Sequence, residues 1–143
     1  MIRKFKEEDT TKVMTIWTKG NFKAHSFIEK DYWLLHFNQV KDEYLKKAET
    51  YVYTKEDEVK GFISLLKDGY IGALFVGIDS QRQGIGRKLI NYAKDRYDRL
   101  TLQVYEKNIN AILFYISLGF INVKIQIDEA TGEKEYVMEW KKN

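Results

Sequence analysis

The stretch Leu74–Ile90, LFVGIDSQRQGIGRKLI, passes from an apolar run through two closely spaced glycines into a basic segment with helical spacing. A strand that turns through glycines into a helix leaves backbone N–H groups free at the helix start, where the macrodipole adds partial positive charge. The stretch is not a dinucleotide-binding fingerprint, because Leu89 takes the place of the third glycine, and it lacks the spacing of a Walker A loop. Taken alone, it either binds a phosphate group or only changes the direction of the chain.

The composition is that of an ordinary globular protein, with 143 residues, 44% hydrophobic and 31% charged. At this length we expect one domain over residues 1–143. No run of 18 apolar residues is present, so we expect no membrane partner. The formal net charge is only +3 and lysines alternate with acidic residues, which argues against a nucleic-acid partner. The start lacks the apolar centre of a secretory signal, and the absence of cysteine excludes disulfides and thiolate metal sites. Both features indicate a cytoplasmic protein.

The N-terminal half predicts a strand, two helices and a hairpin. Residues 2–5 form a short strand, and Asp9 or Thr10 begins a helix that ends near Gly20 and Asn21. Residues 29–48 form a second, longer helix, because apolar residues recur there at spacings of three and four: Trp33, Phe37, Val40, Tyr44 and Ala48. Strands over 50–55 and 59–66 follow, joined by a charged turn.

The segment after the hairpin predicts a strand, a helix and a strand. The Asp68-Gly69 turn leads into residues 70–78, which are apolar nearly throughout, as a strand covered on both faces should be. A helix begins at the two glycines, and residues 100–105 then alternate as a strand. The apolar stripe of that helix is Ile85, Leu89, Ala93 and Tyr97.

The C-terminal segment predicts one more helix and two strands. Asn108 caps the helix and Gly119 ends it, and alternating strands over 120–127 and 135–140 close the chain. The complete order predicts an α+β protein with a mostly antiparallel sheet and one strand-helix-strand crossover around the glycines.

A second stretch, Val104–Phe120 (VYEKNINAILFYISLGF), adds to the glycine turn. Together the two stretches resemble the Gcn5-related N-acetyltransferase (GNAT) family, whose acetyl-CoA loop reads Gln/Arg-x-x-Gly-x-Gly/Ala. Gln81, Gly84 and Gly86 match that loop. The family's second motif, Asn-x-x-Ala-x-x-Phe-Tyr-x-x-x-Gly-Phe, is matched by Asn108, Ala111, Phe114, Tyr115, Gly119 and Phe120.

The resemblance implies the GNAT fold, a mixed and mostly antiparallel central sheet of about six to seven strands flanked by about four helices. The order of elements is similar to that of the family over nearly the whole chain. The N-terminal half, with AHSFI and DYW, resembles a bacterial branch that includes peptide and protein-lysine acetyltransferases.

The resemblance also implies how acetyl-CoA is bound. The backbone of Leu74, Phe75 and Val76 would pair with the pantetheine arm, although these residues also suit a plain core strand. Backbone amides would hold the pyrophosphate, from Arg82, Gln83, Gly84, Ile85, Gly86, Arg87 and Lys88. The basic side chains among them either add charge or are only solvated. Asn108 either contacts the cofactor or only caps its helix.

Tyr115 is the predicted catalytic residue. When an amine attacks the thioester, a phenol close to the sulfur can protonate the departing CoA thiolate as a general acid. Tyr115 also shares a helical stripe with Ala111, Phe114 and Leu118, so its alternative role is that of a core aromatic.

The general base is not identified by the sequence. Several family members carry a glutamate on the preceding strand, and Gln103 stands at that position and cannot take a proton at neutral pH. Glu106, His25 or ordered water remain as candidates.

The acceptor side is predicted from aromatic residues and one histidine: His25, Tyr32, Trp33 and Tyr70. His36 is expected at the surface or in helix packing. The spacing of His and carboxylate residues gives no support for a metal site.

The predicted function is transfer of the acetyl group of acetyl-CoA directly to a primary amine, without a metal. The expected acceptor is a lysine side chain or N-terminus of a peptide or protein. Three alternatives remain: a small amine metabolite, a non-catalytic acyl-CoA-binding module, and an aminoacyl-tRNA acceptor, against which the interleaved charges argue. Edge strands make either a monomer or a homodimer compatible with the sequence.

Overall fold

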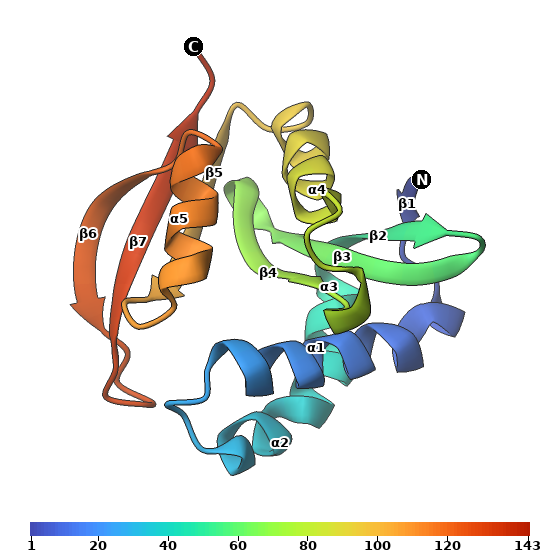
Figure 1. The fold of residues 1–143 in the computed structure, drawn as a ribbon, viewed down its shortest axis with the longest axis horizontal. Helices are drawn as coiled ribbons and strands as arrows, with labels where there is room; N and C mark the ends of the chain where they lie inside the picture. Colours follow the sequence, from blue (N-terminus) through green and yellow to red (C-terminus); the bar gives the residue numbers. More distant parts are fainter.

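A seven-stranded sheet forms the centre of the protein, in a computed structural model that describes all 143 residues (Figure 1). The strands are β1 (Ile2–Lys4), β2 (Glu49–Lys55), β3 (Glu58–Leu66), β4 (Tyr70–Val76), β5 (Arg99–Tyr105), β6 (Ile121–Ile127) and β7 (Lys134–Lys141). Their order in the sheet is β1-β2-β3-β4-β5-β7-β6, and every pair is antiparallel except β4 and β5. The predicted α+β class, with a mostly antiparallel sheet of six to seven strands, is confirmed.

The helices cover both faces of this sheet. They are α1 (Thr10–Ala24), α2 (Lys30–Gln39), η2 (Val40–Tyr44), α3 (Leu45–Lys47), α4 (Ile85–Lys94) and α5 (Ile109–Ser117), with short 3-10 turns at η1 (Glu7–Asp9), η3 (Lys67–Gly69) and η4 (Ile78–Ser80). None of the helices is both long enough and apolar enough to cross a membrane.

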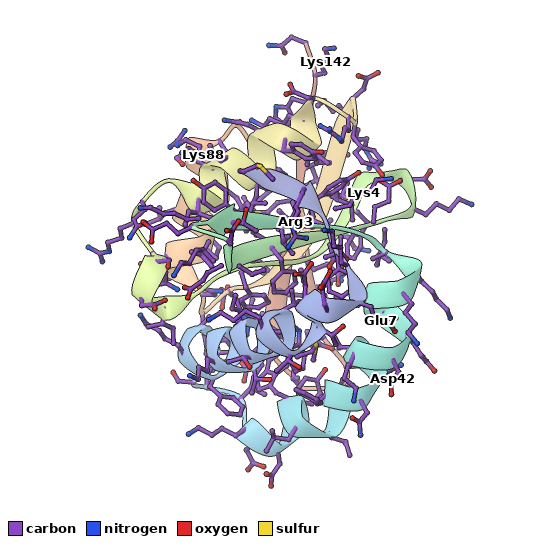
Figure 2. All side chains as sticks on the ribbon, turned by 90° about the vertical axis from the view of Figure 1, so that its right-hand side faces the viewer. Arg3, Lys4, Glu7, Asp42, Lys88 and Lys142 are labelled. Atoms are coloured by element: carbon purple, nitrogen blue, oxygen red, sulfur yellow. The ribbon has the colours of Figure 1, made fainter.

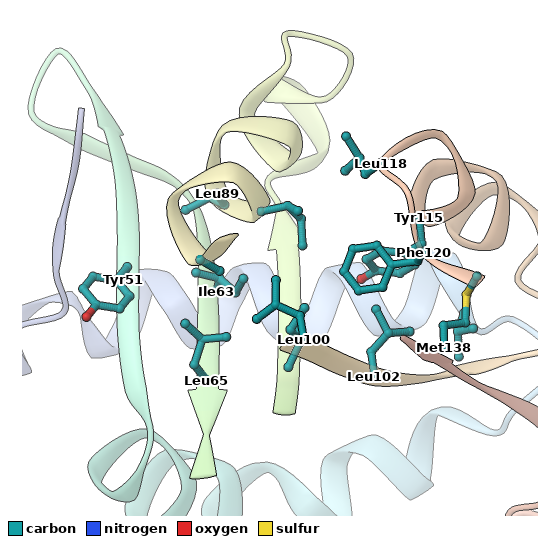
Figure 3. Close-up of a cluster of buried hydrophobic side chains, with 14 of the residues drawn as sticks. Tyr51, Ile63, Leu65, Leu89, Leu100, Leu102, Tyr115, Leu118, Phe120 and Met138 are labelled. Atoms are coloured by element: carbon teal, nitrogen blue, oxygen red, sulfur yellow. The ribbon is translucent and has the colours of Figure 1, made fainter. Parts of the chain in front are cut away.

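Strand alternation sends side chains to two separate cores. On β3, Ile63 and Leu65 belong to a cluster of 15 buried residues beneath α4 and α5, shown in Figure 3. Phe62, directly before Ile63 on the same strand, faces the opposite way into a cluster of eight buried residues with Val13, Trp17 and others from α1. Charged side chains such as Lys4, Lys88 and Lys142 project outward around these layers (Figure 2).

The sheet parts between β4 and β5. These two strands are paired only at Tyr70 and Thr101, whereas β4 is paired with β3 along its whole length. Beyond Tyr70, one edge of β4 therefore has no strand beside it. Both faces of β4 are packed, as predicted, since Leu74 and Val76 contact the larger core and Phe75 the smaller one, but only Ile71 is fully buried and the strand ends at Val76 instead of residue 78.

The first helix is longer than predicted. It does not end at Gly20 and Asn21 but continues to Ala24. Gly20 lies against β4, where a Cβ atom would come 2.5 Å from the Phe75 ring, and Asn21 donates from its side chain to the Trp17 carbonyl (2.9 Å). The two residues that suggested the end of the helix therefore have other roles: the glycine allows close packing against β4, and the asparagine forms a hydrogen bond within the helix.

The predicted second helix is present but contains a wider turn. Backbone angles remain helical from α2 through η2 into α3, and η2 is a π-helical turn. Ala48 is already extended, so the helix ends at Lys47. The predicted stripe faces α1, since Trp33, Phe37 and Val40 pack against the smaller core.

Gly69 fixes the point at which β4 and β5 come together. Its φ is +78°, and a Cβ atom there would overlap the carbonyl oxygen of Arg99 at the start of β5. We expect Gly69→Ala to lower the free energy of unfolding by about 3 kcal/mol, because left-handed strain and a backbone clash add together. Urea unfolding would measure this loss.

Gly132→Ala is the matched control for that change. Its φ is +75°, but nothing lies within 4 Å of an added Cβ, so only the left-handed strain of about 1 kcal/mol applies. Equal losses in the two variants would show that the Arg99 contact does not constrain the sheet.

Candidate functional site

The gap between β4 and β5 exposes the backbone of the strand that was predicted to bind the cofactor. Leu74 and Val76 direct their side chains to the larger core, and Phe75 packs against the opposite core. All three residues are half-buried. The unpaired edge of β4 therefore offers backbone groups for a chain-like ligand to bond, in the way an added strand would. At its end, Gln81 donates from Nε2 to the Val76 carbonyl (3.2 Å).

The start of α4 presents a row of free backbone amides. The N–H groups of residues 82–87 donate to no acceptor in the protein, and Gly84 at the N-cap has no side-chain cap. Arg82 and Gly84 hold left-handed backbone angles, with φ of +65° and +79°. Six free donors at the positive end of a helix suit a pyrophosphate.

Lys88 differs from its predicted role. Its amide donates to the Gly84 carbonyl (3.1 Å) as the first bond of the helix, so it is not free for a ligand. Its ammonium lies 5.6 Å from the centre of the Tyr53 ring on β2. The side chains of Arg82, Gln83 and Arg87 are exposed and form no ion pairs within the protein.

Gly86 allows three elements to pack closely, in addition to leaving room for a ligand at the start of α4. A Cβ atom there would lie 3.1 Å from Cζ of Phe114 on α5 and 3.8 Å from Val76 on β4. The glycine lets α4, α5 and β4 approach each other behind the amide row, while a Cβ on Gly84 would meet nothing within 4 Å. Ile85 anchors the same turn, as it is buried in the larger core.

Tyr115 is buried in the larger core with its hydroxyl group unbonded. Its ring packs against Phe120, with ring centroids 5.4 Å apart (Figure 3), and against Phe114, with ring centroids 5.2 Å apart. No protein group bonds the phenol oxygen, although that oxygen is not sealed from solvent. Burial raises the pKa of Tyr115 well above its usual value. The phenol therefore keeps its proton at neutral pH, and the two predicted roles, core aromatic and proton donor, are compatible.

Asn108 and His25 join the end of α1 to the start of α5. Asn108 caps α5, since its Oδ1 accepts from the Ala111 amide (3.3 Å), and its Nδ2 lies 3.4 Å from Nε2 of His25. The other ring nitrogen of His25 lies 2.9 Å from Oδ1 of Asn21. Because Asn21 Oδ1 can only accept, His25 is protonated on Nδ1 and accepts through Nε2. Helix capping by Asn108 is confirmed.

The environment of His25 makes it a poor base. Both ring nitrogens already have protein partners, and burial lowers its pKa to about 4. The ring stacks on Trp33 (5.2 Å) and meets Tyr105 edge-on (5.1 Å). The neutral His25 ring therefore forms a bridge between the end of α1 and the start of α5, beside the gap.

The predicted acceptor residues lie on the α1–α2 side of the sheet. Tyr32 and Trp33 help to line a cavity of about 190 Å³ between those helices and β4. The Trp33 indole N–H is buried without an acceptor. Tyr70 donates to Oε1 of Gln103 on β5 (3.1 Å), and burial, followed by the nearby Tyr44 and Glu135, raises its pKa to about 12. His36 lines the same cavity and bonds the Tyr32 carbonyl through Nδ1 (2.7 Å).

Three residues of this side were missed by sequence reasoning. Tyr44 lies over Gly72 of β4, Tyr105 packs against His25 and Phe27, and Glu135 is buried on β7. Alternation along residues 100–105 could have placed Tyr105 on the face opposite Val104. Glu106, one of the candidate bases, accepts from the Tyr136 hydroxyl (3.4 Å). No group of three or more His, Asp or Glu side chains is arranged to hold a metal ion.

The chain belongs to the GNAT family of acetyltransferases. The family model described as "Acetyltransferase (GNAT) domain" matches residues 23–141. "Peptidyl-lysine N-acetyltransferase YiaC" of Escherichia coli (strain K12) is 31% identical over 140 residues, which cover 98% of this chain and 96% of that protein. "Peptidyl-lysine N-acetyltransferase YjaB" of Salmonella typhimurium is 31% identical over 130 residues, 90% of this chain and 88% of that protein. The chain is therefore an acetyl-CoA-dependent N-acetyltransferase.

Solved structures show the same fold. The solution structure of apo-form YjaB from Escherichia coli has a TM-score of 0.86 at 25% identity, and the match covers 100% of this chain and 98% of that chain. The PaiA N-acetyltransferase from Thermoplasma acidophilum, in complex with coenzyme A, has a TM-score of 0.81 at 19% identity, over 99% of this chain and 98% of that chain. The predicted family and fold are confirmed.

The lowered pKa of His25 makes a prediction about stability. Because the folded protein favours the neutral ring, His25 contributes stability above its ordinary pKa of 6.5, and this is lost as pH falls toward 4. Between pH 7 and pH 5 the loss from this residue should be about 2 kcal/mol. Urea unfolding of the wild type and of His25→Gln at both pH values would measure it. A pH dependence that is the same in both proteins would contradict the neutral bridge.

Proposed function

We propose that this protein acetylates the ε-amino group of lysine residues in peptides or proteins. The observation that supports acetyl-CoA binding best is the row of six free amides at α4, next to the open edge of β4. The acceptor class is supported by the names of the curated relatives and by the aromatic cavity on the opposite side of the gap.

The cofactor residues have separate roles in this proposal. Amides of Arg82, Gln83, Gly84, Ile85, Gly86 and Arg87 bind the pyrophosphate, and the backbone of Leu74, Phe75 and Val76 bonds the pantetheine arm. Asn108 is close enough to the open end of the gap to border the thioester region, but its side chain already caps α5 and faces His25. We therefore give it a positioning role.

The chemistry requires two protons to leave the acceptor nitrogen, one before and one after attack, one proton to reach the CoA sulfur, and one site of charge stabilisation. The neutral amine attacks the thioester carbonyl, and a β4 amide donates to the oxygen on which negative charge develops. CoA leaves as a thiolate, and the Tyr115 phenol gives its proton to the sulfur. The absence of a protein partner on that phenol leaves its proton available for this step.

The acceptor ammonium loses its first proton to water before attack, and the second proton, released from the nitrogen after attack, passes through water and restores the Tyr115 phenol. Gln103 has no basic group, and it is bonded to Tyr70. Both nitrogens of His25 have partners, and its pKa of about 4 favours the neutral ring too strongly for a base at neutral pH. The exposed Gln103 side chain shows that solvent reaches this part of β5.

A panel of acceptors tests the proposal directly. Lysine-containing peptides, α-amine peptides, polyamines and small amines are incubated with acetyl-CoA, and the products are located by mass spectrometry. We expect acetylation on lysine Nε. Acetylation confined to small amines would reject the peptide acceptor, and a rise in melting temperature with acetyl-CoA but no transfer would indicate a binding module.

Tyr115→Phe tests the proposed acid. The variant should lower kcat at least ten-fold, because thiolate protonation is lost, while acetyl-CoA affinity and melting temperature stay close to wild type since no hydrogen bond is removed. Tyr51→Phe is the matched control, as Tyr51 belongs to the same core but hydrogen-bonds Glu49. An unchanged kcat at saturating substrates would remove Tyr115 from the mechanism.

A further inference from the structure

Glu135 is a buried carboxylate without a cation. Only two acidic side chains in the protein are buried, Asp9 at 6% exposure and Glu135 at 8%. Asp9 is paired with the Arg3 guanidinium through both oxygens (2.8 and 2.9 Å) and also accepts from the Lys6 amide. Glu135 has no ion pair, and its one donor is the neutral amide of Gln126, which reaches Oε2 (2.6 Å).

Burying the Glu135 carboxylate without a positive partner costs free energy in the protein without its substrates. Removing a carboxylate from water is unfavourable unless a positive group and further hydrogen bonds replace the lost hydration. Oε1 of Glu135 accepts no hydrogen bond from the protein, but it is not sealed from solvent. Oε1 therefore remains in contact with solvent.

The sheet register places Glu135 on the acceptor side. It lies directly opposite Tyr105 on β5 and opposite Gln126 on β6, so the three side chains share one face. Tyr105 contacts His25 and Phe27, which follow α1, and this identifies the face as the one beneath α1 and α2. In Figure 1 the turn between β6 and β7 reaches the connection between α1 and α2.

Three tyrosines lie near this carboxylate. Burial raises the pKa of Tyr32, and the negative charges of Asp128 and then Glu135 raise it further. Glu135 also contributes to the raised pKa of Tyr70, after burial and Tyr44. The Tyr105 hydroxyl is held by Asp128 (2.7 Å). The charge of Glu135 thus acts on phenols from α2 and from β4.

The nearby lysine does not neutralise the site. Lys107 is paired with Glu133 (3.0 Å), and its ammonium lies 5.4 Å from the centre of the Phe27 ring. A carboxylate with a free oxygen and with tyrosine rings nearby is an environment in which an alkylammonium is bound by charge and by cation–π contact.

We propose that Glu135 binds the side-chain ammonium of the acceptor lysine, with Tyr32, Tyr70 and Tyr105 forming the walls of that site. This inference rests on the proposed lysine acceptor. Glu135 acts on the charged amine as it enters, before the proton is lost to water, so its contribution falls on acceptor affinity rather than on the rate of transfer.

Glu135→Gln tests the charge at constant shape. We expect the KM for a lysine peptide to rise about ten-fold, with kcat at saturating peptide within three-fold of wild type and the KM for acetyl-CoA unchanged. Glu139→Gln is the matched control: it lies on the same strand and face, but its carboxylate is paired with Arg99. The control should leave the KM for the peptide unchanged.

A binding measurement separates recognition from a structural role. In the presence of CoA, the wild type should bind a lysine peptide about ten-fold more tightly than the same peptide with norleucine, and Glu135→Gln should abolish the difference. If Glu135 only holds the β6–β7 hairpin through Gln126, the variant would change the melting temperature and leave this ratio intact, which would overturn the proposal. An unchanged KM, or a fall in kcat alone, would also overturn it.

Two further outcomes have a defined meaning. If Glu135→Gln does not fold, Glu135→Met, an apolar side chain of similar length, takes its place in both measurements. If the wild type acetylates only small amines, the lysine-peptide proposal fails, and the Glu135 proposal is then judged by the KM for that amine. An ammonium substrate whose KM is the same in wild type and variant would reject Glu135 independently.

Discussion

The parting of β4 from β5 is the constraint on which the rest of the protein depends. A sheet that paired fully at this point would use every backbone group of β4 and leave no edge for a ligand. Tyr70 and Thr101 form the last pair before the gap, and Gly69 permits it by lying against the Arg99 carbonyl. From there the amide row of α4 follows one side of the gap, and Tyr115 follows the other.

Much of this arrangement was readable from local sequence, because it depends on short-range physics. Spacing and capping involve only neighbouring residues, and they predict the glycine turn, the Asn108 cap and the succession of the seven strands along the chain. The two family motifs predicted that acetyl-CoA binds beside this strand and turn, which periodicity alone does not predict. The π-helical turn at Val40–Tyr44 had no sequence signal, since the stripe of apolar residues continues through it.

The remaining features depend on contacts between distant segments. Gly20 suggested a helix stop, but its role is set by Phe75, 55 positions further along the chain. Glu135 lies opposite Gln126 in the register next to the β6–β7 turn, and that register shifts by one residue between Asn122 and Lys124. A shift of that kind reverses which side chains face the cavity, and alternation alone does not locate it.

The bridge between His25 and Asn108 changes the shape of the opening available to a cosubstrate. The two halves of the sheet are joined at Tyr70 and Thr101 at the narrow end, and the hydrogen-bonded pair joins them again at the wide end. The gap is thus spanned at a second place, away from the Tyr70–Thr101 pair. In the proposed binding mode, a long and flexible acyl donor would have to lie between these two connections, with its nucleotide on the α4 side and its reactive end toward the acceptor.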